Sequence, residues 1–168
     1  MTGVSEKTTV QETGAQETDV QETDVKAFET SRDYAHPPEL MFRLFTEPEH
    51  LARWFGPVGF TVEEARTDLK PGGAWRIVMR SPEGNQHRVT GVYEEVSPPV
   101  RVVFSWAWES EDGSLGHVSR VIIAFASTDS GCRMSLRHEN LADDEARAGH
   151  GRGWTSSLES IDAYLETL

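Results

Sequence analysis

The strongest constraint on the fold is a series of short segments, between residues 60 and 139, in which apolar and polar side chains alternate. Trp75, Ile77 and Met79, for example, share one face of such a segment, while Arg76 lies on the other. Turn sequences rich in proline, glycine and asparagine separate the segments, and this pattern predicts an antiparallel meander with one face in the core. The predicted strands are residues 28–35, 60–68, 75–80, 87–96, 102–108, 121–125 and 134–138.

Helical periodicity flanks the meander. Pro38 suits the first turn of one short helix, and a second short helix with Thr46 as its predicted N-cap ends at Gly56 and Pro57. Near the C-terminus, apolar residues at steps of four and three predict a long amphipathic helix headed by Gly153 and Trp154. The members of this apolar stripe are Trp154, Leu158, Ile161, Leu165 and Leu168.

These segments together predict an α+β fold. A curved antiparallel sheet of six to seven strands wraps a long C-terminal helix, and two short helices lie between strands one and two. The sheet is the only large apolar surface against which the C-terminal stripe can be buried. A helix that crosses a curved sheet leaves a wedge of space, which we expect the short helices and loops to gate.

The first 26 residues have a different composition from the rest. Residues 11–25 form a polar, acidic five-residue repeat with almost nothing to bury, which predicts a disordered tail over residues 1–26. Residues 27–168 are of a length that suits one domain. The N-terminus lacks the pattern of a signal peptide, and no apolar run approaches the ~20 residues of a membrane span. We therefore expect a cytoplasmic protein with no membrane contact.

The sequence argues against several kinds of chemistry. A formal charge of −12 disfavours binding of nucleic acid through a basic face. The histidines are scattered and Cys132 is the single cysteine, so we expect neither a metal nor a cofactor. No Gly-x-Ser-x-Gly sequence occurs, and we assign no catalytic residue. The glycine-rich residues 149–153 do not follow a strand, so we interpret them as a flexible or bent entry to the last helix.

Several motifs occur in the order found in one protein family. They are residues 42–57 (FRLFTEPEHLARWFGP), 69–75 (LKPGGAW), 91–99 (GVYEEVSPP), 104–106 (FSW) and 137–139 (RHE), followed by Gly153-Trp154 with Leu158. The chain thereby resembles the helix-grip superfamily, also called START-like or SRPBCC. Within it, the chain is similar to the branch named after the C-terminal domain of the activator of heat-shock-protein-90 ATPase homologue. The resemblance implies the helix-grip fold over residues 27–168.

The indoles and one histidine are the candidate site residues. Large flat side chains beside turn residues are typical of an apolar pocket, although the same side chains can form packed core. His138 shares the inward face of its segment, where it is either a core histidine or a polar contact for a ligand. The predicted ligand-binding residues are Trp54, Phe55, Trp75, Tyr93, Phe104, Trp106, Met134, His138, Trp154 and Leu158.

Three classes of function follow from these residues and from the resemblance. The sequence favours a protein that binds a small apolar or aromatic ligand in a cavity between the sheet and the C-terminal helix. The first alternative is an enzyme resembling a polyketide cyclase, an aromatase or a hydrolase. The second is a co-chaperone that stimulates a heat-shock ATPase. The sequence is also compatible with a homodimer.

Overall fold

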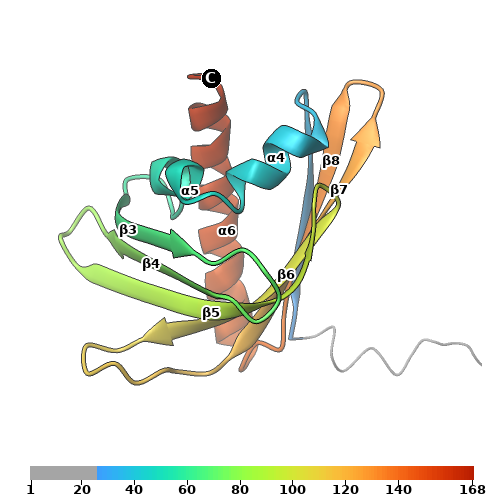
Figure 1. The fold of residues 1–168 in the computed structure, drawn as a ribbon. Helices are drawn as coiled ribbons and strands as arrows, with labels where there is room; N and C mark the ends of the chain where they lie inside the picture. The colour runs from blue at the N-terminus through green and yellow to red at the C-terminus, as the bar shows by residue number, and fades with distance from the viewer. Residues whose placement is uncertain (1–25) are drawn as a thin grey trace, which may run out of the picture.

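A computed structural model describes residues 26–168, which form an α+β fold (Figure 1). Within these residues, seven strands make one antiparallel sheet in the order β2-β8-β7-β6-β5-β4-β3. The strands are β2 (Phe28–Tyr34), β3 (Thr61–Thr67), β4 (Ala74–Arg80), β5 (Gln86–Ser97), β6 (Arg101–Glu109), β7 (Ser119–Thr128) and β8 (Gly131–Glu139). The predicted fold class is confirmed. The disordered tail predicted for residues 1–26 lies outside the described residues, apart from Lys26.

Two short helices and one long helix complete the fold. Helices α4 (Pro38–Leu44) and α5 (Pro48–Trp54) connect β2 to β3, and α6 (Asp144–Leu165) follows β8. The sheet curls around α6, and α5 lies beside the C-terminal half of α6 (Figure 1). There, Nδ1 of His50 and the hydroxyl of Tyr164 lie 2.8 Å apart. The buried side chains of α6 include Trp154, Leu158 and Ile161, so the predicted apolar stripe does face the core.

Helix α6 begins at Asp144, well before the head at Gly153 and Trp154 that the sequence predicted. The carboxylate of Asp143 caps it by accepting a hydrogen bond from the backbone N–H of Ala146 at 2.8 Å. Asp144 and Glu145 add negative charge to the first turn, which favours a helix N-terminus. Capping and tertiary packing thus outweigh the low helix propensity of the glycines, each of which costs about 1 kcal/mol in a helix. At the other end, Leu168 lies beyond the helix and is 59% exposed.

Thr46 closes α4 instead of capping α5. Its hydroxyl donates a hydrogen bond to the carbonyl of Phe42 at 2.9 Å, and the side chain is buried. The N-cap position of α5 is Glu47, which makes no side-chain capping bond. Pro48 occupies the first turn of α5 as predicted. The prediction that Thr46 is the N-cap of α5 was therefore wrong. An N-cap side chain bonds the first turn of its own helix, whereas the hydroxyl of Thr46 bonds α4.

An indole takes part in the pairing of β5 with β6. Trp75 on β4 pairs with Gly91 on β5, and its Nε1–H donates to the carbonyl of Ser105 on β6 at 3.1 Å. The hydroxyl of Ser105 in turn accepts the backbone N–H of Val92 at 2.9 Å. A Cβ atom at Gly91 would lie 1.8 Å from the Ser105 carbonyl oxygen and 2.4 Å from Nε1 of Trp75. Only glycine fits there, and its absence of a side chain lets the indole cross the strand.

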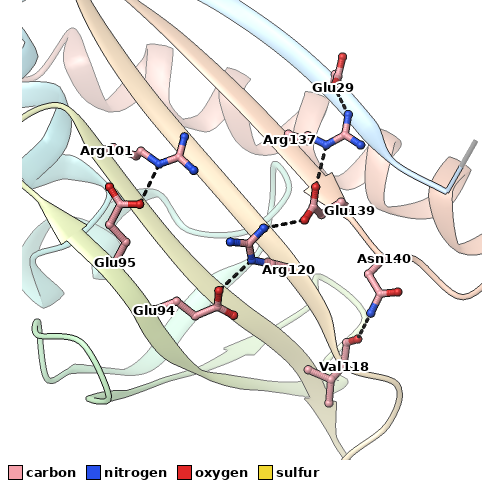
Figure 2. A network of polar contacts seen from close by, with 9 residues as sticks. All are labelled: Glu29, Glu94, Glu95, Arg101, Val118, Arg120, Arg137, Glu139 and Asn140. Carbon is pink, nitrogen blue, oxygen red and sulfur yellow. Dashed lines mark hydrogen bonds and ion pairs between the residues drawn. The ribbon is translucent and has the colours of Figure 1, made fainter. Parts of the chain in front are cut away.

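The outer face of the sheet carries a chain of alternating charges (Figure 2). Glu29 pairs with Arg137, Arg137 with Glu139 at 2.8 Å, Glu139 with Arg120 at 2.7 Å and Arg120 with Glu94 at 2.8 Å. Burial alone would raise the pKa of Glu139, but hydrogen bonds from Arg137 and Arg120 outweigh it and lower the pKa. The chain links β2, β8, β7 and β5, and so keeps the convex face polar.

Candidate functional site

A pocket of about 480 Å³ lies between the first half of α6, the ends of the central strands and the segment after α5. The sheet contributes Met79, His87, Trp106, Trp108 and Ser119. Helix α6 contributes Ala146, Gly149, His150, Gly153, Trp154 and Ser157. Connecting segments add Phe55, Gly56, Pro57, Phe60, His117, Leu141 and Ala142. Among the described residues, no Asp, Glu, Lys or Arg lines the pocket, so its ionisable side chains are histidines.

One face of α6 lines the pocket, and small residues on that face, such as Ala146 and Gly153, leave space unfilled. Ala146, His150, Gly153, Trp154 and Ser157 follow a helical spacing and line the pocket together. A Cβ atom at Gly153 would meet nothing within 4 Å. The first half of α6 therefore faces the pocket, while its second half fills the core with Leu158 and Ile161.

Trp106 lies at the centre of the aromatic wall and is 6% exposed. Its ring centroid is 5.9 Å from that of Phe55 and 5.7 Å from that of Trp154. It is almost perpendicular to two further rings, Trp108 at 5.5 Å and 88° and His150 at 5.7 Å and 86°. Trp106 thus joins the pocket wall to the core.

Trp108 and His150 both contact Trp106 and line the pocket. Their planes differ by only 15° and their ring centroids are 6.2 Å apart. The imidazole of His87 packs against Trp108 at 6.4 Å and against Phe60 at 5.6 Å, and so borders this group of rings.

His138 lies behind this wall and is fully buried. Nε1–H of Trp154 donates to its Nδ1 at 3.0 Å, so Nδ1 carries no proton. Nε2 of the neutral ring must then carry the proton and donate it to the hydroxyl of Ser119 at 2.7 Å. That hydroxyl donates onward to the carbonyl of Trp106 at 3.3 Å. Burial, with a smaller contribution from His150, lowers the pKa of His138 to about 3. The ring is therefore neutral and both its nitrogens are bonded.

The histidines that line the pocket differ from His138 in their hydrogen bonds. Nε2–H of His117 donates to the carbonyl of Asn140 at 2.7 Å, and Asn140 also bonds the carbonyl of Val118 through its side-chain amide (Figure 2). Among the described residues, no hydrogen-bond partner reaches the nitrogens of His87 or His150. Burial lowers the pKa of His150, which keeps its imidazole neutral near pH 7. His150 therefore offers the pocket a neutral imidazole, which can both donate and accept a hydrogen bond.

The structure brings three of the predicted site residues to the pocket surface, namely Phe55, Trp106 and Trp154. His138 lies behind them and is hydrogen-bonded to Trp154. Trp54 and Trp75 are buried, with their indole N–H groups bonded to the carbonyls of Leu44 and Ser105. The remaining predicted residues are part of the hydrophobic core, namely Tyr93, Phe104, Met134 and Leu158.

The sequence reasoning did not select Trp108 or the histidines at positions 87, 117 and 150. Trp108 continues the alternation of Trp106, but at 39% exposure it lies at the edge of the core. His150 could have been found by extending the apolar stripe of the last helix backwards from Trp154 in steps of four. The glycines in residues 149–153 mask this signal, because they are typical of the start of a helix rather than of its interior.

Neither a metal centre nor a membrane span is evident in the described part of the chain. No group of three or more His, Cys, Asp or Glu residues there is placed to hold a metal ion. No helix within residues 26–168 is both long and apolar enough to cross a membrane. Cys132 is fully buried in the core, away from the residues that line the pocket.

The curled antiparallel sheet, the long helix that it holds and the pocket at their junction define a helix-grip protein. The chain belongs to the family described as Activator of Hsp90 ATPase homolog 1-like protein, whose model matches residues 35–166. The predicted family membership is confirmed. No curated protein matches the sequence.

Solved bacterial structures resemble the chain along most of its length. The AHSA1 protein of Silicibacter pomeroyi is 34% identical, with a TM-score of 0.78, over 84% of this chain and 98% of that one. A protein from Nitrosomonas europaea is 27% identical, with a TM-score of 0.72, over 85% and 96% of the two chains. One from Chromobacterium violaceum is 26% identical, with a TM-score of 0.76, over 84% and 97%.

Proposed function

We propose that the protein binds a small apolar or aromatic molecule in the pocket between α6 and the sheet. The observation that carries the proposal is a pocket of about 480 Å³ whose walls are mostly aromatic and aliphatic. Pockets of this size suit small organic ligands, which such walls hold by burial of apolar surface. Glycines on the pocket face of α6 support the same proposal, because they leave this space unfilled.

Two experiments test binding. Native mass spectrometry of the purified protein asks whether a small molecule accompanies it and is released on denaturation. Titration with fatty acids, flavonoids and polyketide-like aromatics, followed by tryptophan emission and by thermal shift, asks whether the pocket takes up such compounds. We expect dissociation constants on the order of micromolar for a ligand held mostly by apolar contacts.

A pair of variants on α6 provides the control. Gly153→Leu adds a side chain from a position that lines the pocket, and we expect it to abolish binding. Ala163→Leu adds the same bulk to an exposed position on the same helix and should leave binding unchanged. If both variants bind like the unmodified protein, the ligand lies elsewhere.

The family description provides a second candidate, the activation of an Hsp90-type ATPase. Stimulation of a purified Hsp90 ATPase by the chain, equal in the unmodified protein and in Gly153→Leu, would favour this co-chaperone function over ligand binding. An enzyme of the cyclase, aromatase or hydrolase kind would instead convert a bound compound, which chromatography of the titration mixtures would detect. A cytoplasmic location and a homodimer stay predictions, to be tested by cell fractionation and by light scattering.

A further inference from the structure

One side of α6 carries three hydroxyl groups at a spacing of four residues, namely those of Ser156, Ser160 and Tyr164. Residues four apart lie above one another on the same side of a helix. Each of these hydroxyls bonds the segment that runs from α5 into β3. We call this row the hydroxyl ladder. Its contact between Tyr164 and His50 holds α5, and its two serines hold the residues that follow α5.

Residues 56–59, which we call the strap, lie between two aromatic anchors. Before the strap, Phe55 stacks on Trp106 with ring centroids 5.9 Å apart. After it, Phe60 packs against His87 at 5.6 Å. Both anchors line the pocket, and so does the first half of the strap. The strap therefore forms part of the pocket wall, and its two ends are held by rings.

Within residues 26–168, two hydrogen bonds attach the strap to α6. The backbone N–H of Val58 donates to Oγ of Ser156 at 2.9 Å, and Oγ of Ser160 donates to the carbonyl of Gly56 at 3.2 Å. The side chain of Val58 adds little, because it is 59% exposed. The Ser160 hydroxyl also has a second acceptor, the carbonyl of Ser156 at 3.5 Å. Because that carbonyl and water can replace the strap, breaking the two bonds costs little.

The backbone of the strap is that of a turn with a glycine hinge on either side of Val58. The N–H of Phe60 donates to the carbonyl of Pro57 at 3.0 Å, which closes the turn. Gly56 and Gly59 have φ angles of +106° and +93°. Glycine reaches both signs of φ at little cost, so rotation at these two positions can swing the turn away from α6.

On the basis of the proposed function, we propose that the strap is the gate of the pocket and that Ser156 and Ser160 hold it closed. When both bonds break, residues 56–59 rotate outward about their glycines. α5 and the aromatic anchors stay in place. The ligand then enters and leaves between the strap and the middle of α6.

Stopped-flow fluorescence with N-phenyl-1-naphthylamine, an uncharged apolar probe, tests the gate on the full chain. The double variant Ser156→Ala/Ser160→Ala should raise the association and dissociation rate constants together, each by at least about threefold, since two hydrogen bonds no longer oppose opening. Its dissociation constant should change by less than about twofold, because the gate sets the barrier to entry and not the contacts of the bound probe.

Thr155→Ala is the control, at an exposed position of α6 that does not line the pocket, and it should leave both rate constants unchanged. Circular dichroism and melting temperature verify that the variants fold. Rate constants of the double variant equal to those of the control would overturn the proposal. So would a rise in the dissociation rate constant alone, because the serines would then stabilise the bound probe instead of closing a gate.

Amide hydrogen exchange followed by NMR tests the gate without a ligand. The amide of Val58 should be at least about a hundredfold less protected than amides at the centre of β7, and Ser156→Ala should lower its protection further. Equal protection of Val58 and β7 would show that the strap opens only when the whole protein unfolds, which overturns the proposal. Rapid exchange in a protein that binds no compound would instead reject the proposed function, while the opening of the strap stands.

Discussion

The indole N–H of Trp154 and Nδ1 of His138, 3.0 Å apart, form a buried side-chain hydrogen bond between α6 and the last strand of the sheet. This bond requires the neutral Nε2–H tautomer of His138, which in turn donates to Ser119. Protonation of Nδ1 would place two donors against each other in the core. The hydrogen bond therefore links the position of the helix to the protonation state of one histidine.

We predict that His138 makes the fold sensitive to mild acid. Its folded pKa of about 3 lies below the ordinary value of about 6.5, so the unfolded chain takes up a proton more readily. The contribution of His138 to stability is constant above pH 6.5 and falls by about 1.4 kcal/mol per pH unit below it, or about 2 kcal/mol by pH 5. Urea unfolding of the protein between pH 7.5 and pH 5 measures this loss.

His138→Gln is the matched variant for the acid sensitivity. Its free energy of unfolding at pH 7.5 should be about 1–3 kcal/mol lower than that of the unmodified protein, because the hydrogen bonds to Trp154 and Ser119 are replaced imperfectly. This difference in unfolding free energy should become smaller as the pH falls to 5. Parallel pH dependences for the two proteins would contradict the neutral, buried state of His138.

Gly151 and Gly153 should respond in different ways to the same substitution. A Cβ at Gly151 would lie 2.9 Å from the ring of Phe28, whereas one at Gly153 meets nothing within 4 Å. Gly153→Ala should therefore stabilise the protein by about 0.5–1 kcal/mol through helix propensity. Gly151→Ala should be less stable than Gly153→Ala by at least about 1 kcal/mol, since Phe28 must move. Chemical denaturation of both variants tests this prediction. Equal stabilities would show that the side chain of Phe28 moves aside at little energetic cost.

Gly91→Ala should be among the most damaging small substitutions in the sheet. Its Cβ would overlap the Ser105 carbonyl oxygen at 1.8 Å, and a backbone atom cannot move aside without disrupting the β5–β6 pairing. We expect a loss of at least about 3 kcal/mol in unfolding free energy. Gly116→Ala, whose nearest neighbour is 3.8 Å away, is the control and should change stability by less than about 1 kcal/mol. A melting temperature of Gly91→Ala close to that of the control would refute this account.

Cys132 should be unreactive in the folded protein. The thiol is fully buried, and burial, with smaller effects from Asp33 and Glu39, raises its pKa and keeps the thiolate scarce. Its reaction with a colorimetric disulfide reagent should follow the unfolding curve measured by circular dichroism in urea. Rapid stoichiometric reaction without denaturant would show that the pairing of β8 with the edge strand β2 opens readily.

The strands were predictable because alternation alone fixes which face of a segment is buried. Residues 60–68 were predicted as a strand and Thr61–Thr67 was found, and residues 87–96 were predicted where Gln86–Ser97 was found. The start of α6 was not predictable in the same way. Glycine opposes a helix locally, and only the contact of Gly151 with Phe28, far away in sequence, shows why it is tolerated there.

Prediction of the candidate site depended on that helix boundary. A third of the residues that line the pocket belong to α6, so a helix thought to begin at Gly153 could not indicate His150 as a pocket residue. The indoles posed a different difficulty. Trp54 and Trp75 bond backbone carbonyls, and sequence patterns do not tell whether an indole N–H meets a carbonyl or a ligand.

The order of the strands has a consequence for how the chain folds during synthesis. Within residues 26–168, β2 has β8 as its single neighbour in the sheet, and Arg137 reaches Glu29 from 108 positions further along the chain. A ribosome must therefore translate nearly the whole domain before β2 finds its hydrogen-bonding partner. Until then, the strands from β3 to β7 can pair with one another, because each follows its neighbour along the chain. β2 has no strand to pair with during this time. Premature termination before β8 would leave both β2 and β7 with open edges, which are the sites where incomplete chains associate.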